Sequence, residues 1–257
     1  RPRGCAVAPS SVVVMPELLT SLLLMFLAAL LYASVGHAGA SGYLAVMALL
    51  GTAPDAMRPA ALVLNLVVAT IGSRNFIRAA PLRCSLCWPS GVASVPMACL
   101  GGRLALPVDV YRVVVGGVLV LSALRFVVTL RQPDRPGQEP PRLVAIATGA
   151  ALGFLAGLTG VGGGIFLSPL LLLAGWASLR VTAATAVVFI LVNSAAGLAG
   201  QLAVIESLPP SLPAWGAAVA LGGAIGSWLG ARRLPSPALR GVLAVVLLVA
   251  GVNLVLD

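Results

Sequence analysis

The sequence predicts an all-α polytopic membrane protein made of two inverted repeats, each with five elements and each containing a short helix that starts in a glycine loop. Hydrophobic residues make up 60% of the 257 positions and charged residues only 9%, which is more apolar surface than a soluble fold can bury. Apolar runs of about 18 to 22 residues recur along the chain, which is the length of a membrane-crossing helix. The same order of long and short runs occurs twice, as in an internal repeat.

The chain divides into two repeats joined by a polar linker. Met15 resembles a natural start, so we interpret residues 1–14 as a leader or an expression remnant. We expect the first membrane repeat over 15–130 and the second over 143–257. Between them, 131–142 is strongly polar and holds four prolines, which is typical of a linker.

Each repeat is expected to contain a long run, a glycine loop, a short run and then three further long runs. Asp55 and Asp109 stand where helix N-caps are expected, and 73–83 is polar enough to form a loop. Prolines and paired glycines inside the fourth run of the first repeat predict a kink. The runs of the first repeat are 18–35, 43–50, 55–71, 86–106 and 109–130. The runs of the second repeat are 143–158, 165–174, 178–201, 212–229 and 238–256.

The arginines favour one orientation of the repeats. If all five elements of each repeat cross the membrane, most arginines collect on one side, which is then cytoplasmic by the positive-inside rule. If the short elements only dip into the membrane, the two sides carry nearly equal numbers. We therefore favour inverted repeats with both termini outside, and leave open whether the short elements cross fully. The basic side holds Arg74, Arg78, Arg83, Arg131, Arg135, Arg142, Arg180, Arg232, Arg233 and Arg240, and the other side holds Arg58, Arg103 and Arg112.

Three consecutive glycines at 162–164 stand between two apolar runs and indicate a binding site. The run that follows them spans about 11 residues, roughly 16 Å of helix, which is too short for a hydrocarbon core of about 30 Å. A glycine-started half-helix in a membrane protein can turn its N–H groups and positive dipole end toward an anion. The alternative interpretation is that the glycines only let two helices pack closely.

The substrate-binding candidates come from the two glycine loops, from nearby hydroxyls and from two asparagines inside long apolar runs. An amide in an apolar run needs a partner, so Asn65 and Asn193 fit equally well as contacts between helices. His37, the single histidine, is the candidate for proton coupling, although a backbone contact would also satisfy it. The substrate-binding candidates are Gly39, Ser41, Gly42, Thr159, Gly162, Gly163, Gly164, Ser168, Asn65 and Asn193.

The composition excludes several kinds of chemistry. The sequence contains no lysine and a single histidine, which excludes lysine-based catalysis and sites built from several histidines. The pair Cys84 and Cys87 alone is a weak metal or redox signal. No aspartate or glutamate lies inside an apolar run, so carboxylate proton relays and sodium sites are not expected. We assign no catalytic residue, no metal ligand and no cofactor, and we expect that the protein is not an enzyme.

The net charge of +9 indicates the bilayer as a partner. In a soluble protein this charge would suggest nucleic acid, but here the arginines flank apolar runs, where they set topology and contact lipid headgroups. We therefore expect a small anionic substrate and the lipid bilayer as partners, and no nucleic acid. Whether two copies form a homodimer is left open.

The stretch GLTGVGGGIFLSPLL at 157–171, followed by RVTAAT at 180–185, resembles the TauE/SafE sulfite-exporter family of membrane permeases. The resemblance covers 15–256, and it implies a multi-pass inner-membrane permease that exports sulfite, related sulfur oxyanions or small organosulfonates. The first-half copy, HAGASGY at 37–43, departs from the motif because it lacks the triple glycine and the following proline. The alternatives are a permease for a metal ion or another small solute, and a membrane-embedded enzyme.

Overall fold

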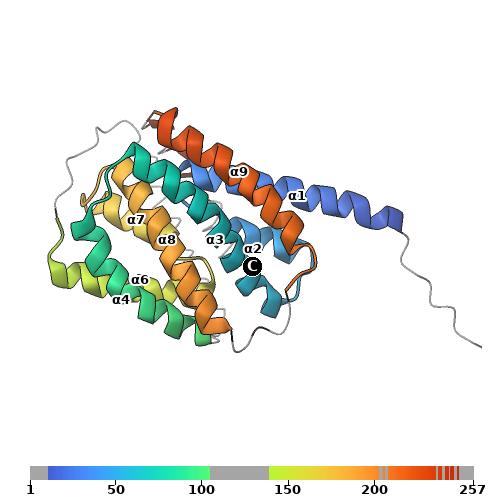
Figure 1. Ribbon diagram of the computed structural model, residues 1–257, viewed down its shortest axis with the longest axis horizontal. Helices are drawn as coiled ribbons and strands as arrows, with labels where there is room; N and C mark the ends of the chain where they lie inside the picture. Colours follow the sequence, from blue (N-terminus) through green and yellow to red (C-terminus); the bar gives the residue numbers. More distant parts are fainter. Residues whose placement is uncertain are drawn as a thin grey trace, which may run out of the picture.

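The computed structural model describes residues 11–104, 139–202 and 208–235, together with positions 205, 237, 238, 241, 242, 244, 245 and 248. Every regular element among these residues is an α-helix, as the sequence predicts (Figure 1). Five stretches of these helices are long and apolar enough to cross a membrane, namely Glu17–Ser34, Asp55–Ala79, Arg142–Thr159, Leu179–Gln201 and Leu212–Arg232.

The two halves contain matching sets of helices. In the first half these are α1 (Ser11–Ser34), α2 (Ala40–Leu49), α3 (Pro54–Ala79) and α4 (Cys84–Arg103). In the second half they are α6 (Arg142–Thr159), α7 (Gly164–Leu173), α8 (Leu179–Gln201) and α9 (Leu212–Arg232). Both predicted short runs are confirmed as helices, and each has ten residues. The predicted run 109–130 lies outside the described residues, as does most of 238–256.

Two details of the first half differ from the prediction. The helix expected to end near residue 71 continues as α3 to Ala79, so 73–79 is not a loop. The reason is tertiary: Phe76 is buried, and the Asn75 side chain donates to the Ser227 hydroxyl over 2.8 Å, which ties this polar turn to α9. In addition, Asp55 is not the N-cap of α3, because the helix already starts at Pro54 after the N-cap Ala53.

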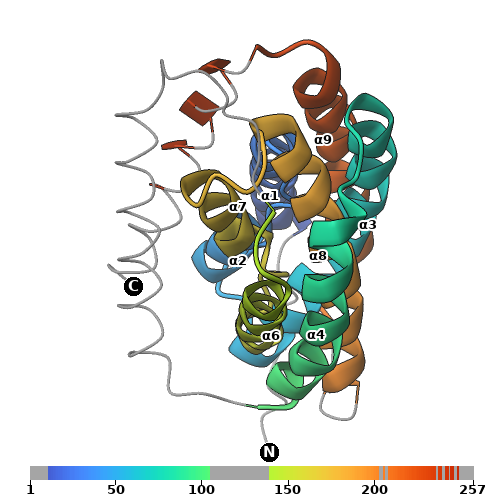
Figure 2. The ribbon, with the colours of Figure 1, turned by 90° about the vertical axis from the view of Figure 1, so that its left-hand side faces the viewer.

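The helices of the two halves pack in a crossed pattern. The first helix of each half packs against the fourth helix of the other half, giving the pairs α1 with α9 and α6 with α4. The third helices, α3 and α8, contact each other in the middle of the bundle (Figure 1). The short helices α2 and α7 lie on one side of the bundle, opposite α3, α4, α8 and α9 (Figure 2). Two equivalent helix pairs therefore flank a central pair.

Rows of glycines bring the helices of each flanking pair into backbone contact. A Cβ added to any glycine in these rows would collide with a carbonyl of the partner helix. In lipid, helices associate through such small-residue faces, because apolar side chains gain little by leaving the hydrocarbon. Gly149, Gly153 and Gly157 of α6 face Ser90, Ser94 and Ala98 of α4, while Gly222, Gly226 and Gly230 of α9 face Phe26, Leu30 and Ser34 of α1.

Candidate functional site

Glycines in left-handed backbone conformation start both short helices. Gly39, the N-cap of α2, has φ 107°, and Gly163, the N-cap of α7, has φ 79°. Gly36, Gly160 and Gly162 in the preceding turns also have positive φ. Residues with a Cβ are disfavoured in this region, so the chain needs glycine at these positions to turn from a long helix into a short one.

His37 connects the two glycine turns. Its Nε2 lies 3.0 Å from the carbonyl oxygen of Gly164 and 3.0 Å from the hydroxyl oxygen of Ser168. A carbonyl oxygen can only accept, so Nε2 carries the hydrogen. The side chain is 2% exposed, and its Nδ1 has no hydrogen-bond partner among the described residues. The imidazole of His37 therefore connects the first glycine turn to Gly164 and Ser168 near the start of α7.

Asn65 of α3 holds the other end of the second glycine turn. Its Nδ2 donates to the carbonyl of Val161 over 3.2 Å and lies 3.4 Å from the Ser194 hydroxyl. A Cβ on Gly162 would lie 2.7 Å from that hydroxyl and 3.0 Å from the amide nitrogen. The turn is thus enclosed between α3 and α8, and Gly162 has no room for a side chain.

The remaining candidates bond mainly within their own half. The Ser41 hydroxyl donates to the Tyr32 hydroxyl over 2.8 Å. The Thr159 hydroxyl accepts from the Val161 N–H over 3.2 Å. Asn193 donates to the carbonyl of Phe189 in its own helix over 2.8 Å. Of the predicted site residues, the structure gathers His37, Asn65, Gly162, Gly163, Gly164 and Ser168 at the start of α7. Thr159 bonds within the second turn, whereas Ser41 and Asn193 bond to Tyr32 and Phe189.

Two residues at the second turn were not found from the sequence. Ser194 looks like any small hydroxyl inside a long apolar run, and only the fold brings it to Gly162. Arg58 was interpreted as a topology signal, but its guanidinium donates to the carbonyl of Gly157 over 3.1 Å, next to the turn. The charge of Arg58 near the start of a long run was the one signal that could have marked it.

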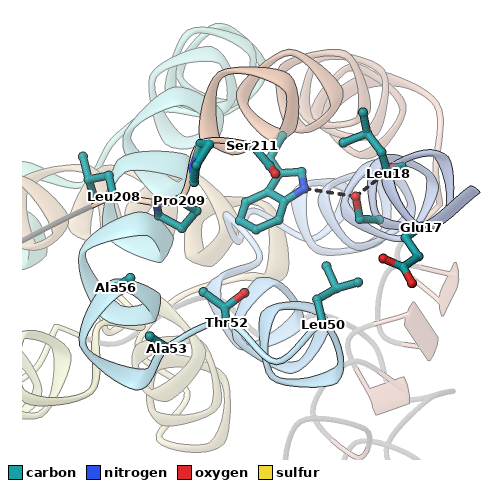
Figure 3. A pocket seen from close by; sticks show the side chains of 12 residues that line it. Glu17, Leu18, Leu50, Thr52, Ala53, Ala56, Leu208, Pro209 and Ser211 are labelled. Atoms are coloured by element: carbon teal, nitrogen blue, oxygen red, sulfur yellow. Dashed lines mark hydrogen bonds between the residues drawn. The ribbon is translucent and has the colours of Figure 1, made fainter. Parts of the chain in front are cut away.

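A cavity of about 680 Å³ opens at one end of the bundle (Figure 3). It is lined by the start of α1, by the α2–α3 connection and by 208–211 together with Trp215. The Trp215 indole N–H donates to the Ser21 hydroxyl over 3.1 Å, which joins α9 to α1 beside the cavity. The topology prediction places these three segments on one side of the membrane, and the cavity is where they meet. Among the described residues that line it, Glu17 is the one with a charged side chain.

In the part of the chain that the structure describes, no three His, Cys, Asp or Glu side chains lie together in a group that could hold a metal ion.

The helices, the enclosed glycine turns and the apolar surfaces describe a multi-pass membrane protein, and the comparisons with known proteins define its class as a membrane transporter. Residues 21–254 match the family described as sulfite exporter TauE/SafE, and the chain belongs to this family. A relative in Sinorhizobium fredii, named as the probable membrane transporter protein y4hK, is 42% identical over 233 residues, which cover 89% of this chain and 94% of the relative. No solved structure gives a significant match.

Proposed function

We propose that this transporter is a permease that carries sulfite, related sulfur oxyanions or small organosulfonates outward across the inner membrane. Membership of the sulfite exporter family supports the substrate class. The observation that carries the proposal is the pair of short helices that begin at left-handed glycines and are joined by the contact of His37 with Gly164 and Ser168.

The chemistry of such a site suits a weakly held anion. The N-terminus of each short helix offers free N–H groups and the positive end of a dipole, worth about 0.3–1 kcal/mol for an anion and up to about 2 kcal/mol when partly buried. In this proposal Gly39, Ser41 and Gly42 serve the first turn, Thr159 and Ser168 serve the second turn beside its three glycines, and Asn65 and Asn193 add amide contacts. Dipoles, hydroxyls and amides hold an anion weakly, so the anion can leave again.

The direction of transport follows from charge. An anion that leaves a negative-inside cell gains about 2.3 kcal/mol per charge for each 100 mV, so export needs no coupling ion. Within the apolar runs, aspartate occurs only at their starts, as Asp55 and Asp109, and no aspartate or glutamate lies in the middle of a run, where it could bind a driving proton or sodium ion. His37 is the one side chain we propose as a proton-coupling residue if coupling occurs.

A flux screen in liposomes tests the proposal. Purified protein is reconstituted, and the fluxes of sulfite, sulfate, thiosulfate, sulfoacetate and chloride are compared with empty liposomes. We expect flux of one or more sulfur anions above the rate for chloride. Metal-ion uptake that His37→Ala abolishes, with no anion flux, would replace the proposal with a metal permease. Turnover of a substrate that needs His37 would indicate an enzyme.

A further inference from the structure

We propose that Arg58 is an anion-binding residue of this permease, whose guanidinium contacts the oxygens of the sulfur oxyanion beside the second glycine turn. This inference rests on the proposed function, and it adds a cationic contact to a site otherwise built from dipoles and neutral side chains. The observations that carry it are the position of Arg58, its bonding and a comparison between the two halves.

Arg58 lies directly on the second glycine turn. A Cβ added to Gly160 would lie 3.4 Å from the Cα and Cβ atoms of Arg58. Asn65, which bonds to the same turn through Val161, follows Arg58 by two helical turns, about 10 Å along the same face of α3. One face of α3 therefore presents the Asn65 amide and the backbone end of Arg58 to the turn that starts α7, and the Arg58 guanidinium lies on Gly157, just before that turn.

Among the residues that the structure describes, no carboxylate neutralises the charge of Arg58. Its two terminal nitrogens donate to the carbonyls of Gly157, over 3.1 Å, and Leu104, over 3.4 Å, and it forms no ion pair among the described residues. Its Nε is enclosed and has no hydrogen-bond partner there. An arginine inside a membrane protein without an acidic partner is costly, and such residues commonly mark ion pathways. The planar guanidinium matches the geometry of an oxyanion.

The second half supplies an internal comparison. A Cβ added to Gly36 of the first turn would lie 2.5 Å from the Cα of Ala183 in α8, whereas a Cβ added to Gly160 would lie 3.4 Å from Arg58 of α3, so the first turn packs more tightly against its helix. At the constant spacing that relates Gly36 to Gly160, the residue of α8 that corresponds to Arg58 is Thr182, so a short neutral side chain occupies the equivalent position. The difference favours a role for the guanidinium beyond packing.

Helix capping alone is the competing explanation, and Arg180 provides the control for it. Near the start of α8, Arg180 donates to the carbonyls of Ala231 and Leu234 over 2.6 Å and 3.2 Å, at the end of α9. Arg58 makes the same kind of contact from the start of α3 to the ends of α4 and α6. If capping were the whole role, the same substitution at the two arginines would have similar consequences.

The test measures sulfite and sulfoacetate flux against concentration for wild type, Arg58→Gln, Arg58→Lys and Arg180→Gln in liposomes, with thermal stability measured in parallel. We expect Arg58→Gln to raise KM for the transported anion by about ten- to a hundredfold, because a charged hydrogen-bond partner is lost. Arg58→Lys, which keeps the charge without the planar fork, should raise it by a smaller factor, and Arg180→Gln should lower stability with KM within twofold of wild type.

An unchanged KM in folded Arg58→Gln, or equal KM changes at Arg58 and Arg180, would overturn the inference while leaving the proposed function standing. If Arg58→Gln does not fold, an unchanged KM in Arg58→Lys overturns it in the same way. Wild-type protein that carries neither anion would remove the proposed function, and the inference with it.

Discussion

The two glycine turns share two left-handed glycine positions but have different side-chain partners, and only the second turn has a third left-handed glycine, Gly162. Both lead into helices of ten residues, α2 and α7. Each short helix is also followed by a further glycine in left-handed conformation. The glycines correspond at one constant spacing along the chain and all have positive φ: Gly36 with Gly160, Gly39 with Gly163, and Gly51 with Gly175.

The polar contacts, in contrast, gather at the second turn. His37 reaches Gly164, and Asn65 reaches Val161, so both side chains come from the first half and bond to the second. At the position equivalent to Arg58, α8 carries the neutral Thr182, and its neighbour Ala183 lies against Gly36 of the first turn. The backbone of the repeat is thus duplicated, while its polar chemistry is concentrated at one copy. Changes at the second turn should therefore affect transport more than matched changes elsewhere.

The proposed inversion of the two halves predicts an all-or-none labelling result. Single cysteines at Ser85 and Ser207, in a background without native cysteines, should react with an impermeant thiol reagent from opposite sides of the membrane. We expect position 85 to be cytoplasmic, because arginines surround it, and position 207 to be external. Reaction of both positions from the same side would contradict the inverted arrangement.

Gly163→Val should reduce transport to the background of empty liposomes while the protein remains detectable. Valine is disfavoured at φ 79°, and its Cβ would lie 2.9 Å from the Phe189 ring and 3.0 Å from Ala156. Gly175→Ala is the matched control, because its φ is 67° but no atom lies within 4 Å of the added Cβ. It should cost about 1–2 kcal/mol of strain and keep most of the flux. Normal flux in Gly163→Val would mean that the glycine is only tolerated there.

Asn65→Leu should lower stability by about 1–3 kcal/mol, because the buried carbonyl of Val161 loses its donor. Asn193→Leu is the control in the same chemical class. Asn193 donates only to the Phe189 carbonyl of its own helix, so its loss should cost less than about 1 kcal/mol. Thermal unfolding in detergent measures both. Equal losses of stability in the two variants would mean that the Asn65 contact with Val161 contributes no more than the Asn193 contact within its own helix.

The smallest effects are expected from two of the three candidate hydroxyls, Ser168 and Ser41. Ser168→Ala removes a hydroxyl 3.0 Å from His37 Nε2, and we expect a rise of several-fold in KM. Ser41→Ala removes a donor to Tyr32 in the first half, and KM should change by less than about twofold. Anion flux as a function of concentration gives both values, and a larger effect at Ser41 would reverse the proposed asymmetry.

The sequence was sufficient for the elements that local patterns determine. The apolar run lengths predicted the long and short helices, and the glycines marked both turns. The end of α3 was missed because Arg74, Asn75 and Arg78 resemble a loop until the contact of Asn75 with Ser227 is known. Ser194 and Arg58 were missed for the same reason, since each meets the second glycine turn only through packing between distant segments.

The driving force of the flux tests the central claim, that an anion moves alone through this permease. Anion flux is measured under a potassium–valinomycin potential, with and without an imposed pH step, in wild type and His37→Gln. The account predicts that flux follows the potential and persists when proton and sodium gradients are collapsed. At 100 mV a monovalent anion gains about 2.3 kcal/mol, near a fifty-fold concentration ratio. Flux that ignores the potential, follows the pH step and loses that dependence in His37→Gln would contradict this account and assign proton coupling to His37.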